Sequence, residues 1–138
     1  MLTELPEAIT NLSNLTTLGL HRNRICRVCE QIGAMTSLQV LSMQHNRITQ
    51  LPTTFGRLAS LMDLQLTHNR LGSASWLPTL TSLVHLGLSH NALRSLPADL
   101  HALTRLSTVA IAHNKLDSLP SALLGLPSLL LLDASNNK

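Results

Sequence analysis

Aromatic residues are almost absent from this chain of 138 residues, which has one Phe, one Trp and no Tyr. Charged residues are also scarce, at 12%, against an average of about 25% in globular domains. Proteins that bind single-stranded nucleic acid usually combine clustered Lys and Arg with exposed aromatic side chains. The sequence therefore disfavours that class, and its net charge of +3 makes the chain only mildly basic.

Long apolar runs and cysteines are scarce as well. The longest purely apolar runs, such as Leu129 to Leu132, are far shorter than the roughly 20 residues that a transmembrane helix needs. The segment from Met1 to Pro6 has neither the basic nor the apolar region of a secretory signal. Two cysteines do not make a disulfide framework and fit a reducing compartment. We therefore expect a cytoplasmic protein that has no membrane span.

Leucine, by contrast, is abundant: 33 of the residues are Leu, and hydrophobic residues make up 44% of the chain. A core built from so few side-chain shapes indicates a repetitive architecture. The pattern L-x-x-L-x-L-x-x-N-x-L, with other aliphatic residues at some of its leucine positions, recurs along the whole chain. Its asparagines lie at positions 23, 46, 69, 91, 114 and 137, so the period is 23 residues with one repeat shortened to 22.

The spacing within a repeat predicts its local structure. Leu18 and Leu20 alternate with Thr17 and Gly19, the period of two that is typical of a short strand with one buried face. Strands of successive repeats would pair in parallel, and the amide of each asparagine would satisfy the turning backbone. Apolar residues spaced by three predict a short helical or 3₁₀ turn in the other half of the repeat, led by Leu5-Pro6, Leu51-Pro52, Leu96-Pro97 and Leu119-Pro120.

These features are the signature of leucine-rich repeats. The pattern resembles the 23-residue class found in Ras-pathway scaffold proteins, Scribble-like polarity proteins and plant intracellular Ras-group leucine-rich-repeat proteins. The resemblance covers residues 1–138 and implies one α/β domain, a curved solenoid of about six repeats. Its parallel β-sheet would line the concave face and its short helical turns the convex face. The resemblance also implies a protein-binding role, without a common partner.

Two departures from the pattern stand out. The segment from Leu71 to Leu83 is one residue short, and we expect a local change of curvature there, with Trp76 filling the gap. The chain also begins within a repeat, because Leu2 stands at the position of Ile25 and Ile48, and it ends one residue after Asn137. No terminal caps are visible, although solenoids normally need them. We therefore expect either a fragment of a larger protein or ends that allow self-association.

The outward strand positions predict the binding surface, because solenoids usually bind partners on the concave face. Most of these side chains are small and neutral, so an extended peptide or a helix could approach closely. Asp63 and His85 would be polar anchors; alternatively, the small side chains only accommodate the curvature. The candidate contacts on this face are Val40, Gln44, Asp63, Gln65, Thr67 and His85.

A row of histidines precedes the asparagines and is a further candidate contact: His45, His68, His90 and His113. Neighbouring strands lie about 4.8 Å apart, so the imidazoles could stack in one line. A metal needs convergent ligands, which a line does not supply, so we expect no metal. The row is either exposed filler or a pH-sensitive contact. In the second case, repulsion between protonated rings would lower partner affinity as the pH falls from about 7.5 to about 5.5.

A second row, basic in character, follows the asparagines: Arg24, Arg47 and Arg70, with Arg22 nearby. It is either an anion-binding rim or a solvated edge that maintains solubility. Cys26 and Cys29 form a lone C-x-x-C, in which Cys29 stands where other repeats have Pro. A zinc ribbon would need a second pair, so we expect a structural role for both cysteines.

The hypothesis that accounts best for these patterns is a cytoplasmic protein-protein interaction module, or part of a signalling scaffold, that binds another protein on its concave sheet. The alternative is anion or nucleic-acid binding through the rim of Arg22, Arg24, Arg47 and Arg70. No arrangement of nucleophile, acid and base is visible, so we expect neither an enzyme nor a cofactor.

Overall fold

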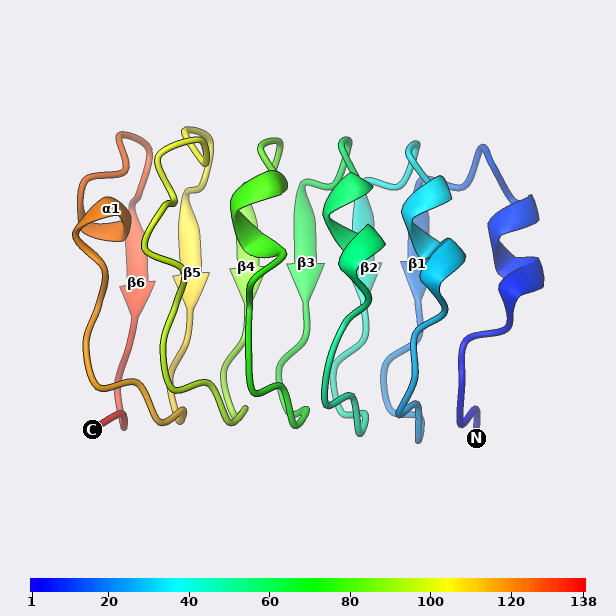
Figure 1. The fold of residues 1–138 in the computed structure, drawn as a ribbon, viewed down its shortest axis with the longest axis horizontal. Coiled ribbons are helices and arrows are strands. Elements are labelled where there is room, and N and C mark those ends of the chain that lie inside the picture. Colours follow the sequence, from blue (N-terminus) through cyan, green and yellow to red (C-terminus); the bar gives the residue numbers. More distant parts are fainter.

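The computed structural model describes residues 1–138 and shows six short strands in one parallel sheet, in chain order (Figure 1). The strands are β1 (Thr17–Gly19), β2 (Val40–Ser42), β3 (Asp63–Gln65), β4 (His85–Gly87), β5 (Thr108–Ala110) and β6 (Leu131–Asp133). Their register joins equivalent repeat positions, so that Leu18 pairs with Leu41 and Leu41 with Leu64. The solenoid with one strand per repeat is therefore confirmed.

A second layer of short helical turns faces the sheet (Figure 1). It contains the 3₁₀ helices η1 (Glu7–Asn11), η2 (Glu30–Ala34), η3 (Thr53–Arg57) and η4 (Leu77–Thr79), and the helix α1 (Ser121–Leu124). An extended proline precedes η1, η3 and α1, where its fixed φ suits the start of a helical turn. Cys29 takes the place of proline before η2 with nearly the same backbone angles.

The helix expected after Leu96-Pro97 does not form. In η1 the N–H of Ile9 donates to the carbonyl of Pro6 at 3.1 Å, whereas Leu100 makes no such bond to Pro97. Leu100 and Leu103 are nevertheless fully buried. The expectation of a helical turn is therefore wrong at this repeat. The leucine spacing determines which side chains reach the core, and Leu100 and Leu103 reach it although the backbone does not form the first helical hydrogen bond.

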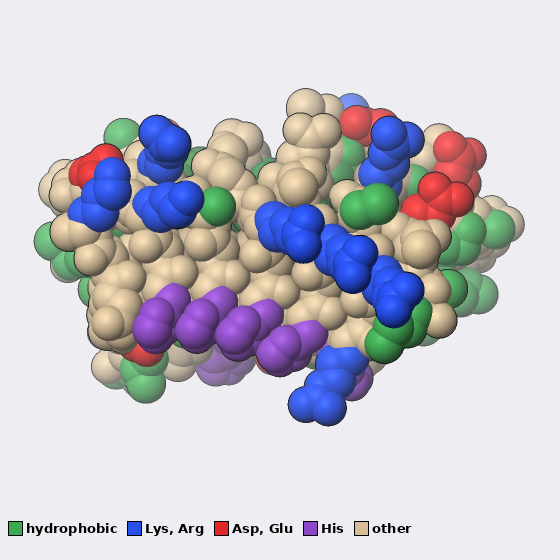
Figure 2. All heavy atoms as spheres, turned by 90° about the horizontal axis from the view of Figure 1, so that it is seen from below, with side chains coloured by type: hydrophobic (Ala, Val, Ile, Leu, Met, Phe, Trp, Pro, Cys, Tyr) green, Lys and Arg blue, Asp and Glu red, His purple; other side chains and the backbone are tan.

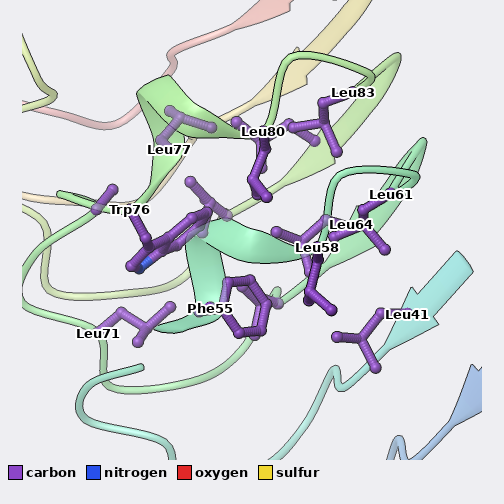
Figure 3. Packing of buried hydrophobic residues seen from close by; sticks show 14 of the residues in the cluster. Leu41, Phe55, Leu58, Leu61, Leu64, Leu71, Trp76, Leu77, Leu80 and Leu83 are labelled. Atoms are coloured by element: carbon purple, nitrogen blue, oxygen red, sulfur yellow. The ribbon is translucent and has the colours of Figure 1, made fainter. Parts of the chain in front are cut away.

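The core runs along the whole solenoid between the two layers and contains 34 buried residues. Its two aromatic rings meet at the shortened repeat, where Trp76 packs edge-on against Phe55 with 5.3 Å between ring centroids (Figure 3). Trp76 is buried. It directly precedes η4 and has a helical backbone, whereas the residues that precede the other helical turns are extended. The prediction that Trp76 fills the gap left by the missing residue is therefore confirmed.

The asparagines form a continuous ladder between neighbouring repeats, in which Asn46, Asn69 and Asn114 are buried and the others half-buried. The side chain of Asn46 accepts a hydrogen bond from the N–H of Ile25 at 2.9 Å and donates to the carbonyls of Leu20 and Met43 at 2.9 and 3.1 Å. The other asparagines repeat this pattern, from Asn23, which accepts from Leu2, to Asn137, which accepts from Leu116. Each amide thus satisfies the backbone of two repeats, as the sequence predicts.

Large apolar side chains are exposed only near the two ends of the solenoid. They are Met1, Leu2, Leu12, Leu124, Leu130 and Leu131. The middle repeats have no such side chain, although Val40, Met62 and Val84 are half-buried there.

Candidate functional site

The concave face carries an ordered polar cluster on β3 and β4. The amide of Gln65 donates to the carboxylate of Asp63 at 2.7 Å, and a ring nitrogen of His85 lies 2.8 Å from the hydroxyl of Thr108. The sheet register places Asp63 beside His85, between Val40 and Thr108. The structure therefore brings together the three polar residues that the strand alternation predicts for this face, with their side chains held by neighbours.

Several small residues at outward strand positions contribute little surface, contrary to the expectation of an open face of small side chains. Gly87, Ser89 and Ala112 are buried. The side chain of Gln65 lies over Gly87, and a β-carbon at that position would collide with its amide oxygen. Among the candidate contacts on this face His85 is exposed, whereas Val40, Gln44, Asp63, Gln65 and Thr67 are half-buried.

The histidine row occupies a special backbone position. His45, His68, His90 and His113 have φ between 54 and 56°, and the equivalent Arg22 and Asn136 have φ of 56 and 53°. Residues other than Gly rarely adopt this left-handed conformation, although Asn, Asp and His do so more often than most. The turn itself therefore explains part of the preference for histidine here.

The four imidazoles stack face to face along the border of the concave face (Figure 2). Their centroids are 4.4, 4.1 and 4.1 Å apart and their planes are within 14° of parallel. The amide of Asn136 contacts a ring nitrogen of His113 at 3.2 Å. Partial desolvation between its neighbours, and then their positive charges, lower the pKa of His68. We call these four residues the histidine ladder; the predicted stacking is confirmed.

The basic rim runs beside the histidine ladder (Figure 2). Arg22, Arg24, Arg47 and Arg70 are exposed and none pairs with a carboxylate. Glu4, Glu7 and Glu30 lie in the same N-terminal repeats without pairing with these arginines, and the one ion pair joins Lys138 to Asp117 at 3.4 Å. Asp133 lies close enough to His113 to feel its charge, although hydrogen bonds from Ser135 are the main cause that lowers the pKa of Asp133. The arginines of the basic rim therefore carry positive charge that no ion pair neutralises.

A polar hollow of about 360 Å³ joins the concave face to the basic rim. It is lined by His21, Arg22, Ser42, Gln44 and His45, and no hydrophobic residue contributes. The Oε1 atom of Gln44 is buried and has no hydrogen-bond partner. The residue spacing gives no signal for this hollow, because it depends on how side chains of two neighbouring repeats are arranged.

The cysteines and the other candidate sites can be described briefly. Cys26 is exposed, Cys29 is half-buried and both are free thiols. Burial raises the pKa of the Cys29 thiol, which keeps it protonated and unreactive. No group of three or more His, Cys, Asp or Glu side chains could hold a metal ion. No helix has the length and apolar character that crossing a membrane requires.

One parallel strand per repeat, a helical layer opposite the sheet and a buried asparagine ladder define a solenoid repeat protein. The family described as "Leucine-rich repeat region" matches residues 2–86, and the chain belongs to this family. No curated protein matches the chain significantly.

Solved structures extend the same similarity to the whole chain. A leucine-rich-repeat protein of Leptospira interrogans is 31% identical, with a TM-score of 0.94, over 99% of this chain and 35% of that one. The ectodomain of the Arabidopsis thaliana receptor kinase GASSHO1/SCHENGEN3, solved in complex with CASPARIAN STRIP INTEGRITY FACTOR 2, is 29% identical. The match covers 98% of this chain and 17% of the receptor, with a TM-score of 0.89. A Listeria monocytogenes internalin, 23% identical over 97% of this chain and 45% of that one with a TM-score of 0.77, shows the fold alone. The chain thus spans about a third of the Leptospira protein and a smaller part of the receptor.

Proposed function

We propose that this chain is a protein-interaction module that binds an extended segment of another protein on its concave sheet, centred on β3 and β4. The observation that carries the proposal is the polar cluster of Asp63, Gln65 and His85, whose side chains are held by neighbours before any partner arrives. Such pre-organisation reduces the ordering cost of binding.

The surroundings of this cluster support the same proposal. Gly87 has no side chain and is covered by the Gln65 amide and the Thr67 hydroxyl, so a partner backbone would meet these two polar groups directly over the sheet. Leucine-rich repeats are generally binding modules rather than enzymes, and the Arabidopsis receptor is a related fold solved in complex with a partner. We therefore assign no catalytic role to the chain.

A peptide-library selection on the full chain tests this proposal. Selected peptides should bind a triple variant, Asp63→Ala, Gln65→Ala and His85→Ala, at least about tenfold more weakly, because central contacts dominate binding energy. A convex triple variant, Gln31→Ala, Thr53→Ala and Arg57→Ala, changes exposed residues only and should bind like the wild type. Equal affinities for the wild type and the concave variant, with both folded by circular dichroism, would place the binding site elsewhere.

The basic rim supports a second candidate function, the binding of an anion. Arg22, Arg24, Arg47 and Arg70 are exposed without carboxylate partners. Nucleic acid is the less suitable anion, because the faces of the neighbouring imidazoles are stacked against one another and both large aromatic rings are buried. Binding of a labelled oligonucleotide that weakens steeply with salt would favour nucleic acid over protein.

We also propose the cytoplasm as the location of the chain, supported by its two free thiols. Imaging of the tagged native protein, with a reporter that fluoresces only in the cytoplasm, tests this proposal. A signal from outside the cytoplasm would contradict it.

A further inference from the structure

The edge between the concave sheet and the helical layer carries two neighbouring rows that the proposed peptide site does not use. We define this cationic edge as the histidine ladder together with the basic rim. We propose that the cationic edge binds an acidic polypeptide segment, rich in Asp and Glu, and that this binding tightens as the pH falls. The proposal concerns residues other than the concave cluster and stands independently of it.

The first argument is unneutralised charge. The arginines of the basic rim have no carboxylate within ion-pair distance, and the one ion pair of the protein lies at its C-terminal end. A guanidinium binds a carboxylate through two parallel hydrogen bonds, which makes arginine suited to carboxylate recognition. The rim therefore offers a run of such sites to a carboxylate-rich ligand.

The second argument is the geometry of the imidazoles. Because their faces are stacked at 4.1 to 4.4 Å, only ring edges are free within the ladder. Ring edges carry N–H groups, which donate to oxygen atoms. Nucleobases would need open aromatic faces for stacking, so the ladder suits the oxygen atoms of an acidic chain better than the bases of a nucleic acid.

The third argument distinguishes a peptide from a phosphate polymer. The hollow lined by Arg22, Gln44 and His45 carries positive charge, and the buried amide oxygen of Gln44 has no donor. A peptide brings backbone N–H groups as well as carboxylates, so it could satisfy Gln44 if that side chain turns into the hollow. A phosphate polymer brings only acceptors at neutral pH and would leave this oxygen unsatisfied.

The charge distribution also sets the position of the segment. Arg22, Arg24, Arg47 and Arg70 span the first three repeats, and Ala92 interrupts the row before Lys115. Asp133, beside His113, would repel carboxylates at the last repeats. Neighbouring strands are about 4.8 Å apart, so contacts from Arg22 to His90 cover about 14 Å, the length of roughly four extended residues. A short acidic segment therefore suffices.

Protonation links this binding to pH. In the free protein, desolvation and the charges of His90, His45 and His113 hold the pKa of His68 below its ordinary value. Arg22 continues the ladder at its N-terminal end, and the other rim arginines are the cations that run beside it. Asp133, near His113, is the acidic group that acts in the other direction.

A bound carboxylate would offset this repulsion and favour the protonated rings. Binding then takes up protons, and by linkage the affinity increases as the pH falls. This sign is opposite to the sequence-based hypothesis of weaker binding at low pH. That hypothesis considered repulsion between the rings without the charge of the partner.

An octapeptide of aspartates, labelled with a fluorophore, is a direct probe of the cationic edge. Its Kd for the full chain, measured by anisotropy at constant ionic strength, should decrease about tenfold between pH 7.5 and pH 5.5. Aspartate stays ionised over this range, because its ordinary pKa is about 3.9. The change in affinity would therefore report the protein and not the probe.

Two variants separate the two rows. Replacing the four ladder histidines by Asn should leave the affinity at pH 7.5 nearly unchanged and abolish the pH dependence. Asn136 shows that asparagine accepts the same backbone conformation. Arg24→Gln, Arg47→Gln and Arg70→Gln together should weaken binding at both pH values. A charge-matched pair of double variants completes the comparison: Arg57→Gln with Arg105→Gln, at exposed sites away from the rim, should weaken binding much less than Arg47→Gln with Arg70→Gln.

The proposal is wrong if the octapeptide fails to bind, or if the two double arginine variants weaken binding equally. It is also overturned if a phosphate polymer of equal charge binds more tightly than the peptide, or if the asparagine variant keeps the pH dependence. The concave triple variant should bind the octapeptide like the wild type. Failure of the concave proposal would therefore be distinguishable from failure of this one.

Discussion

Two rows of side chains run along the same turn of the solenoid, one residue apart in sequence, and they differ in almost every physical respect. The asparagines point inward: Asn46, Asn69 and Asn114 are buried, and their amides bridge neighbouring repeats. The histidines directly before them are exposed and contact mainly one another.

The difference shows how a repeat separates folding from binding. An inward position must match two carbonyls and one N–H, which only an amide side chain of this length does here. The outward position must only tolerate a positive φ, and Arg22, His68 and Asn136 all do so. The outer row is therefore free to vary with a partner, whereas the inner row is fixed by the fold.

The largest effect is expected from the inner row. Asn69→Ala should reduce the free energy of unfolding by about 3 kcal/mol, because it leaves buried backbone groups without partners. These groups are the N–H of Ile48 and the carbonyls of Met43 and Leu66. Urea denaturation of the variant and the wild type measures the change.

The matched control is His68→Asn, which changes the neighbouring residue and keeps a side chain that accepts the same backbone. Its stability should stay within about 0.5 kcal/mol of the wild type, as for most surface substitutions. Equal losses in the two variants would remove the distinction between the rows.

Much of this contrast is predictable from the sequence. The regular spacing of asparagines and the alternation around Leu18 and Leu20 are enough to predict a parallel sheet, a buried ladder and an exposed row of histidines. These features depend on one repeat and its period, and a period is visible in a single sequence.

The features that sequence reasoning missed depend on contacts between repeats or on hydrogen bonds that the core does not require. The burial of Gly87 under Gln65 and the hollow at Gln44 arise from side chains of neighbouring strands. The turn after Pro97 lacks its first helical bond although its leucines pack normally. The positive φ of the histidines could have been suspected, because His and Asn share this position in different repeats.

An intermediate effect is expected from a substitution that tests the backbone of the outer row. His68→Val should reduce the stability by about 1–2 kcal/mol, because a β-branched residue fits the left-handed conformation poorly. His68 has a φ of 56°. Thermal or urea unfolding of the Val variant beside the Asn variant measures the strain, and equal stability of the two would show that the turn relaxes without cost.

The smallest effect is expected from pH. Since the pKa of His68 is lower in the folded protein than its ordinary value, the contribution of this group is fully present above the unfolded pKa of about 6.5. It is lost progressively as the pH falls from there through the lower folded value. The melting temperature of the wild type should therefore decline slightly more between pH 8 and pH 5 than that of His68→Asn, at constant salt. Keeping the pH above 5 excludes a contribution from Asp133, because its lowered pKa places its titration at more acidic values. If the melting temperatures of the two proteins decline equally with pH, the stacked rings move apart when protonated, and the ladder does not oppose protonation of His68.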